Sequence, residues 1–216
     1  MQRVEKYFWK KFGRIILPNR NLWWNQTHAM IPTLDKLEDG RIKIYYSGRD
    51  EHNISHIGWS LIDLKDPFKI IDFCEDPVLS PGQIGCFDDN GVTPSCIINH
   101  KGQKYLYYIG WNPGYNVRMH LFGGLAISTD NGKSFDRYSQ APVIERSRIN
   151  PFLNTAPYVI KKGNKFIMYY VSGTTWINKN LPKYNIQIGF SNDGLRWERK
   201  GDIAIDFKDD NETALA

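Results

Sequence analysis

The sequence predicts an all-β protein in which one four-stranded antiparallel unit is repeated around a common axis, as in a β-propeller. Three segments share a proline, an apolar run, a glycine turn and a tyrosine pair: Pro32–Gly48, Pro94–Gly110 and Pro157–Gly173. The first two prolines are 62 positions apart and the next two are 63 apart. A fixed period of this size indicates one supersecondary unit used repeatedly.

Each repeat offers about four short strands separated by turn residues. After the tyrosine pair, a loop leads to a short apolar run, seen at His56–Ser60, Gly124–Ser128 and Ile186–Ser191. A polar turn and a last segment follow, at Pro67–Ile71, Ser134–Ser139 and Leu195–Gly201. Parts of these runs alternate with the period of a half-buried strand. No long run has helical spacing and caps.

The repeats divide the chain into consecutive units of a single propeller domain over 1–216. We expect a lead-in over 1–25, with one strand at Gly13–Pro18, and blades at roughly 26–85, 86–150 and 151–210. The stretch 211–216 is similar to the opening of a further blade. Because a propeller needs at least four blades to close its ring, the sequence predicts a propeller that is truncated at its C-terminus. The alternative is closure by association with another chain.

Net charge and composition limit the classes of partner and cofactor that we expect for this chain. The formal net charge is +5, but the basic residues are scattered, so we expect no nucleic-acid partner. The N-terminus has no apolar core of a signal peptide and no stretch reaches membrane-spanning length, which predicts a cytoplasmic protein. The three cysteines have no C-x-x-C spacing, so we expect no disulfide, metal or other cofactor. The oligomeric state is open.

Two polar turns have a structural explanation. Ser128–Phe135 fits the pattern S-x-D-x-G-x-x-[FW], and Ser191–Trp197 is a version one residue shorter. In such turns the aspartate accepts backbone hydrogen bonds and the glycine takes a positive φ. These turns resemble the Asp-box of sialidases, which implies a structural role for Asp130 and Asp193.

The functional end of a propeller is the mouth of its axis, formed by the start of each innermost strand and the loops after each second strand. These stretches gather aromatic and polar side chains, which is the inventory of a sugar-binding site. We therefore predict the following substrate-binding residues: Trp24, Arg49, Asp50, Trp111, Asn112, Asn154, Thr155 and Trp176.

The complete blade pattern, with a tyrosine pair, a polar turn and a closing Pro77–Leu79 or Pro142–Ile144, resembles a known group. It is similar to the five-bladed propellers of the arabinanase, β-xylosidase and invertase type, glycoside hydrolase families 43 and 32 and their relatives, which implies five blades in the complete protein. The resemblance implies a glycosidase-like protein that hydrolyses or transfers a glycosidic bond through axial carboxylates, and a carbohydrate partner. Polysaccharide metabolism is the implied context.

The acids of that group are not found at their usual positions. Ile31, Ser95 with Cys96, and Thr155 stand where the group carries carboxylates. If the acids have moved, Asp88 and Asp89 are the best pair. Asp50, Glu51 and Glu212 are possible partners, and His28 could serve as an acid or a sugar ligand.

Two other functions follow from the same observations. A non-catalytic carbohydrate-binding propeller would explain the missing carboxylates. A sialidase-like enzyme would explain the Asp-box turns, but it requires three arginines around the axis, and only Arg49 is well placed. The sequence does not decide the sugar, the linkage or the stereochemical outcome.

Overall fold

The protein is all-β, as the repeat predicts. Across residues 8–216, which the computed structural model describes, there are twelve strands and no helix. The first unit is one antiparallel sheet whose spatial order follows the chain. Its strands are β1 (Met30–Lys36), β2 (Ile42–Arg49), β3 (Ser55–Asp63) and β4 (Asp66–Phe73).

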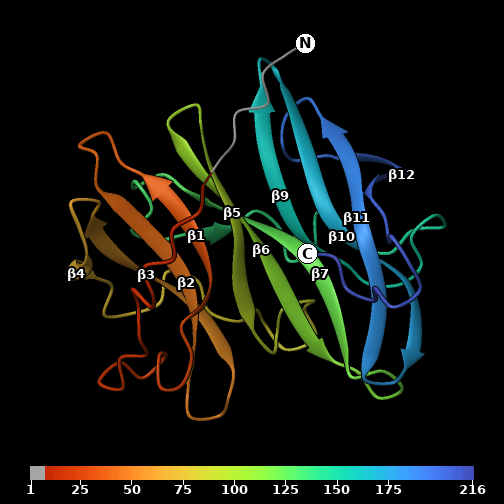
Figure 1. The fold of residues 1–216 in the computed structure, drawn as a ribbon, viewed down its shortest axis with the longest axis horizontal. Helices are drawn as coiled ribbons and strands as arrows, with labels where there is room; N and C mark the ends of the chain where they lie inside the picture. The colour runs from red at the N-terminus through yellow and green to blue at the C-terminus, as the bar shows by residue number, and fades with distance from the viewer. Residues whose placement is uncertain (1–7) are drawn as a thin grey trace.

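The second and third units repeat this arrangement beside the first (Figure 1). The second unit has β5 (Val92–His100), β6 (Gln103–Pro113), β7 (Met119–Ser128) and the short β8 (Asp136–Arg137). The third has β9 (Asn154–Lys162), β10 (Lys165–Asn178), β11 (Leu181–Ser191) and β12 (Glu198–Ile205). Strand β1 contacts β5, and β5 contacts β9, so the first strands converge on one side of the fan.

Each unit is linked to the following segment by one parallel bridge from its third strand. Ser55 pairs with Gly91, Phe122 with Asn154, and Tyr184 with Ala214. The middle bridge merges units two and three into one continuous sheet. The last bridge places Ala214 beside the third strand of unit three. The starts of β5 and β9 lie beside the third strands of units one and two in the same way.

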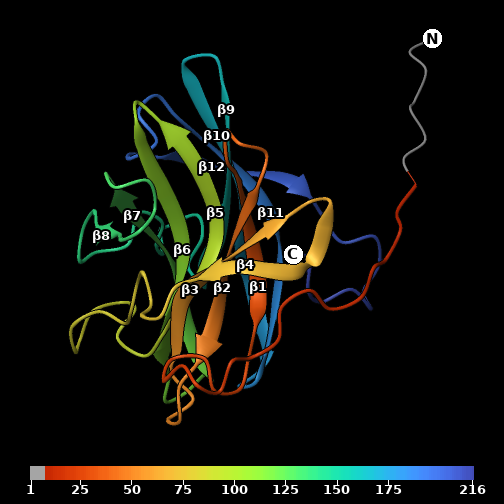
Figure 2. The same ribbon diagram turned by 90° about the vertical axis from the view of Figure 1, so that its left-hand side faces the viewer.

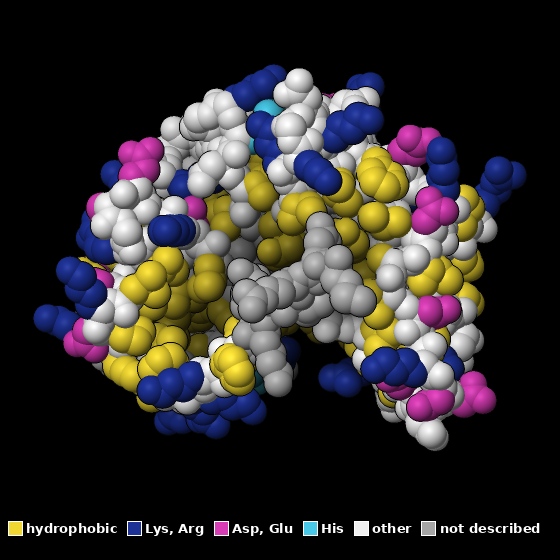
Figure 3. All heavy atoms as spheres, turned by 45° about the horizontal axis from the view of Figure 1, so that its top comes forward, with side chains coloured by type: hydrophobic (Ala, Val, Ile, Leu, Met, Phe, Trp, Pro, Cys, Tyr) yellow, Lys and Arg dark blue, Asp and Glu magenta, His cyan; other side chains and the backbone are white. Residues whose placement is uncertain are grey.

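The fan is open, and its sheets do not close into a ring. Figure 3 shows an arch with hydrophobic side chains gathered on its hollowed side. Innermost strands leave apolar side chains accessible, since Leu34 of β1 is 63% exposed and Tyr158 of β9 is 58% exposed.

The strand predicted at Gly13–Pro18 does not form. These residues run as coil in Figure 2, and they add no strand to the first sheet. Ile15 and Ile16 instead pack against the buried side chains of Ile42, Ile44 and Ile62. Hydrophobic contact alone therefore holds this segment, and its apolar run was mistaken for a strand.

At least one tyrosine of each pair packs in a space between units. Tyr45 and Tyr108 belong to a buried cluster shared by units one and two, and Tyr107 and Tyr170 to one shared by units two and three. Cys96 is free and buried in the second of these clusters, Cys74 is free and buried beside Trp24 and Tyr46, and burial raises the pKa of each thiol to about 11. Both are therefore protonated, weakly nucleophilic thiols at neutral pH.

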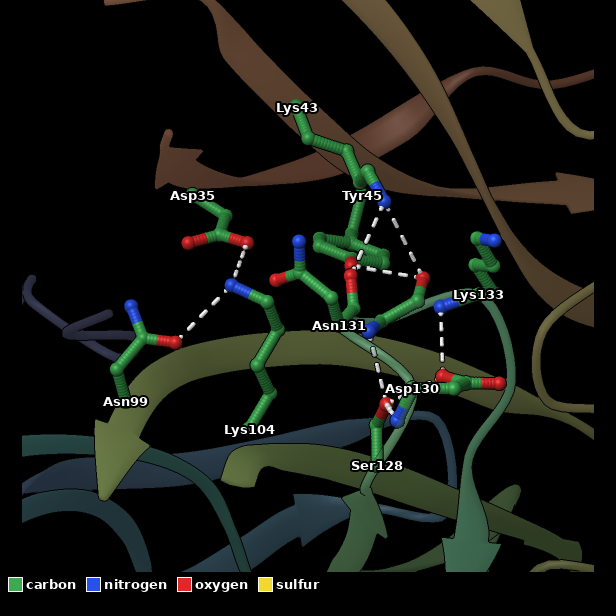
Figure 4. A network of polar contacts seen from close by, with 10 residues as sticks. Asp35, Lys43, Tyr45, Asn99, Lys104, Ser128, Asp130, Asn131 and Lys133 are labelled. Atoms are coloured by element: carbon green, nitrogen blue, oxygen red, sulfur yellow. Dashed lines mark hydrogen bonds and ion pairs between the residues drawn. The ribbon is translucent and has the colours of Figure 1, made fainter. Parts of the chain in front are cut away.

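The Asp-box turn of unit two lies across the end of unit one. Tyr45 donates its hydroxyl hydrogen to the carbonyl oxygen of Gly132, 3.1 Å away, and Lys43 reaches the carbonyls of Asn131 and Gly132. Beside them, Lys104 Nζ lies 2.7 Å from Asp35 Oδ2 and 3.0 Å from Asn99 Oδ1. Figure 4 shows these groups meeting at one seam. The turn is thus structural, as its pattern indicates.

Candidate functional site

Two adjoining pockets lie where β6 ends and β7 begins, at the end of the fan opposite the Asp-box turns. We call one the acid pocket: about 550 Å³, lined by Ile84, Gly85, Asp89, Asn90, Asn112, Pro113 and His120. We call the other the arginine pocket: about 180 Å³, lined by Arg49, Asn53, Ser55, Asn90, Trp111, Asn112, Pro113, Arg118 and Met119. Asn90, Asn112 and Pro113 line both pockets, so a ligand could extend from one to the other.

Asp89 is the carboxylate of the acid pocket. Its Oδ1 accepts a hydrogen bond of 2.5 Å from Asn112 Nδ2, and its Oδ2 accepts one of 2.8 Å from the Gly85 backbone N–H. Asn112 also donates to the carbonyl oxygen of Cys86, which fixes the amide between the loop and β6. The carboxylate is half-buried, oriented on both oxygens and open to the pocket.

Asp88 points the other way, into the protein. Its carboxylate is fully buried, with Oδ2 2.8 Å from Arg137 Nε and 2.9 Å from the Tyr108 hydroxyl. Burial raises the pKa of Tyr108, and the neighbouring carboxylate raises it further, so the phenol remains a donor at neutral pH. Arg137 also bonds the carbonyl of Ser80. Asp88 therefore orders the loop that carries Asp89.

Asp50 belongs to a second buried polar chain, in unit one. Its Oδ1 accepts hydrogen bonds from the amides of His52 and Ile54, and its Oδ2 lies 3.2 Å from His56 Nε2. The other ring nitrogen of His56 lies 3.1 Å from the Ser80 hydroxyl. Burial lowers the pKa of His56, and it outweighs the raising effect of Asp50. Burial would raise the pKa of Asp50, but the hydrogen bonds from Ile54 and His56 outweigh it and lower that pKa.

Three predicted site residues line or support the two pockets besides Asp89: Arg49, Trp111 and Asn112. Trp111 donates from Nε1 to the Thr93 hydroxyl, 3.2 Å away, which holds its ring beside the arginine pocket. Trp176 lies near this end of the fan, partly buried against a cluster that includes Leu121 and Leu153.

Other predicted residues are placed where they do not reach these pockets. Trp24 is fully buried, donates to the Glu75 carbonyl, and has no ring face free for a sugar. Asn154 and Thr155 are also buried, with Asn154 bonded to Asn150 and Ser172, and Thr155 to the Phe122 carbonyl. His28 is exposed against the lead-in, beside Thr27. Glu212 accepts a hydrogen bond from the Lys208 amide near the C-terminal end of the chain.

Sequence reasoning missed several polar groups at this end. It did not select His120, which faces the acid pocket and has Arg146 Nη2 2.5 Å from its Nδ1. Burial lowers the pKa of His120, and the charge of Arg146 lowers it further, so the imidazole is neutral at pH 7. Arg118 lies in the same long loop as His120 and was not selected either, although the position of this loop after a second strand indicates the mouth, and Arg137 was missed. No spacing signal marks these residues, because strand register alone brings them to the site.

Within the described part of the chain, no group of three or more His, Cys, Asp or Glu side chains is arranged to hold a metal ion. No helix among these residues is long and apolar enough to cross a membrane.

No protein-family model matches the chain. Among curated proteins, the uncharacterized protein Rv1502 of Mycobacterium tuberculosis is 36% identical over 208 residues, covering 95% of this chain and 69% of that protein. A beta-1,2-mannobiose phosphorylase of Thermoanaerobacter sp. is 30% identical over 96 residues, covering 42% of this chain and 31% of the phosphorylase.

Solved structures show the same fold. A glycoside hydrolase superposes with a TM-score of 0.71 at 17% identity, covering 95% of this chain. A structure described under mannoside phosphorylases of glycoside hydrolase family 130 superposes with a TM-score of 0.63 at 17% identity, covering 88% of this chain. The chain spans 65% and 57% of the lengths of these two structures.

The neighbours confirm a glycoside hydrolase-type fold, while the five-bladed count stays a prediction. The extended match at 36% identity identifies the family, and the chain belongs to the same family as the uncharacterized protein Rv1502 of Mycobacterium tuberculosis.

Proposed function

We propose that this protein is a carbohydrate-active enzyme that cleaves a glycosidic bond at the acid pocket, with Asp89 as the reacting carboxylate. The observation that carries the proposal is the setting of Asp89: its carboxylate is held at both oxygens by Gly85 and Asn112, yet it opens into a pocket. A carboxyl group so placed can give a proton to the leaving oxygen or activate an attacking group.

The comparisons support the class of reaction. The mannoside phosphorylases of Thermoanaerobacter sp. match 42% and 47% of this chain, and the solved structures include glycoside hydrolases. The proposal covers both hydrolysis, in which water attacks the anomeric carbon, and phosphorolysis, in which phosphate does so. A β-1,2-linked mannoside is the first substrate to test, because the relatives are named for that linkage.

Asp88 is given no reacting role in this proposal. Its side chain has no exposed surface and its Oδ2 is paired with Arg137, so a substrate oxygen cannot reach the carboxylate in this arrangement of the loop. Its role is to position Asp89 by holding the loop against Tyr108 and Arg137.

The test is turnover of β-1,2-mannobiose and of a panel of aryl glycosides, each with and without phosphate, by the full chain. General acid or base catalysis is worth roughly 10²- to 10⁴-fold, so Asp89→Asn should lower the rate by about that factor. Asp202→Asn removes an exposed carboxylate on β12 and serves as the control. Equal rates for wild type and Asp89→Asn would overturn the proposal.

A sugar-binding protein without turnover is the second candidate. It is favoured by Thr155, which stands at a position where the resembled group carries an acid and whose hydroxyl is already used by the Phe122 carbonyl. Saturable glycan binding with no product from any substrate of the panel would favour this candidate over the enzyme.

A further inference from the structure

We propose that the arginine pocket binds an oxyanion, a phosphate or carboxylate group, next to the reacting carboxylate. The role of the anion in the reaction rests on the proposed function, because the anion takes part in the reaction only if the neighbouring Asp89 is the reacting carboxylate. The binding itself can be measured without any turnover.

The first argument is the set of side chains around the pocket. Arg49 and Arg118 lie on it together with three asparagines, Ser55 and Trp111, and no described lining residue is acidic. Neither arginine forms an ion pair with a carboxylate within residues 8–216. Guanidinium groups present planar forks of N–H donors that match carboxylate and phosphate oxygens. The pocket thus offers donors and positive charge without an internal counter-ion.

The second argument is an unmet hydrogen-bond donor. Arg49 donates from Nη1 to Asn53 Oδ1 at 2.8 Å, but its Nε is buried and has no acceptor among the described residues. A buried N–H without an acceptor costs about 1–3 kcal/mol, and more on a charged group. The Arg49 guanidinium thus lacks a full set of acceptors, and an anion is the ligand that would complete it.

The third argument is that the pocket is built from two units held in register. Arg49 ends β2 of unit one, and Arg118 precedes β7 of unit two. The parallel bridge between Ser55 and Gly91 joins the two units at this place. A Cβ on Gly91 would lie 2.5 Å from Ser55 Oγ, and its φ is +143°, so only glycine allows this close approach. The Arg118 amide is bound to the Lys179 carbonyl at 2.7 Å, which anchors that loop to unit three.

The fourth argument is that the arginine pocket adjoins the reacting carboxylate of Asp89. Asn112 lines both pockets and contacts Asp89 directly at 2.5 Å. An oxyanion between Arg49 and Arg118 is therefore one side chain away from the reacting carboxylate. Such an anion would be either free phosphate, placed to attack the anomeric carbon, or an acidic group carried by the sugar.

The test is binding measured by isothermal titration calorimetry on the full chain, with four probes. They are inorganic phosphate, mannose 6-phosphate, glucuronate and uncharged mannose. Arg49→Gln and Arg118→Gln each remove one guanidinium. Arg196→Gln, an exposed arginine on the Asp-box turn at the other end of the fan, removes the same charge and is the control.

We expect at least one anionic probe to bind saturably, each pocket variant to weaken it by about tenfold or more, and Arg196→Gln to leave it unchanged. Binding of inorganic phosphate assigns the site to free phosphate, whereas binding of only the sugar-borne anions assigns it to an acidic substrate. No saturable anion binding, or equal binding by Arg49→Gln and wild type, would overturn the proposal. Asp89→Asn should still bind the anion, because it leaves both arginines in place. If the wild-type protein binds the anion but turns over no substrate, the proposed function fails and the anion site stands.

Discussion

The hydroxyl of Tyr107 in unit two donates to the carbonyl oxygen of Gly194 in the Asp-box turn of unit three, at 2.6 Å. The same relationship joins Tyr45 to Gly132, one unit earlier, at 3.1 Å. The first tyrosine of each of these pairs therefore attaches its unit to the turn of the next unit. This explains why the tyrosine pairs and the polar turns recur with one period.

We expect Tyr107→Phe to destabilise the protein by about 1–2 kcal/mol, because it leaves a buried Gly194 carbonyl without its donor. Tyr45→Phe should cost less, about 1 kcal/mol, since Lys43 also reaches the Gly132 carbonyl. Tyr169→Phe is the matched control, because Tyr169 is the corresponding tyrosine of unit three and its hydroxyl has no hydrogen-bond partner in the described structure. Urea unfolding of the three variants measures this, and equal losses would contradict the assignment.

The buried pair of Lys104 and Asp35 predicts a strongly non-additive double substitution. Their side chains are 7% and 2% exposed, so removing one leaves a buried charge. Lys104→Met alone should cost about 3–5 kcal/mol, and adding Asp35→Asn should recover part of it. Lys200→Met breaks an exposed pair with Glu198 and should change the free energy of unfolding by less than about 1 kcal/mol. Simple additivity in the double-mutant cycle would refute the coupling.

His56 predicts a loss of stability in mild acid. Burial holds its pKa in the folded protein below the ordinary histidine value of 6.5, so the unfolded chain binds the proton more readily. Its contribution is fully present above pH 6.5 and is lost as the pH falls from there through the lowered folded pKa. One proton gives a slope of at most about 1.4 kcal/mol per pH unit.

The measurement is the free energy of unfolding of wild type and His56→Gln at several pH values between 7.5 and 5. The two curves should converge as the pH falls, because the variant has no imidazole at this position. Parallel curves would show that His56 does not titrate differently in the folded and unfolded states. The lowered pKa values of His100 and His120 contribute in both proteins and cancel in the comparison.

Ile31 predicts a stabilising substitution. Its φ is 51°, in the left-handed region, where a β-branched residue is strained by roughly 1–2 kcal/mol. It is 43% exposed, so little burial is lost on replacement. Ile31→Asn should raise the free energy of unfolding by about 1 kcal/mol, because asparagine tolerates this conformation.

Ile160→Asn is the control for that prediction, since Ile160 is 37% exposed but is not among the residues with positive φ. It should be neutral or destabilising in the same denaturation experiment. A stability gain from both substitutions would show that polarity, and not backbone strain, is responsible.

Much of the fold follows from the sequence, because the period is carried by side chains that fill repeated positions. The tyrosine pairs fall on β2, β6 and β10, and the apolar runs after them on β3, β7 and β11. The last strands were harder to predict. Leu195–Trp197 belongs to the Asp-box turn, so β12 begins only at Glu198, and β8 is reduced to Asp136 and Arg137. Hydrogen bonds within the turn, such as that from the Leu195 amide to Asp193, hold these residues out of the strand despite their strand propensity.

The site was harder to predict from the sequence than the fold, because it depends on contacts between residues that are far apart in the chain. Asp88 and Asp89 are adjacent, and their opposite orientations depend on which one meets Arg137, a residue 49 positions away from Asp88. Arg49 and Trp111 could be placed at the mouth because they closely follow the tyrosine pairs, near the ends of the second strands β2 and β6. The partners Arg118 and His120 come from a loop whose path is set by contact with Lys179 and Arg146, and no local pattern reports those contacts.

The Asp-box seams lie at the end of the fan opposite the acid pocket and the arginine pocket. Contacts such as Tyr45 with Gly132 hold neighbouring units together at one end, whereas the loops that carry Arg118 and Asp89 lie at the other. Side chains in these loops can therefore vary during evolution, or be redesigned, without weakening the Asp-box seams that hold the units together at the other end. A scaffold of this kind can acquire new substrates while its architecture stays constant.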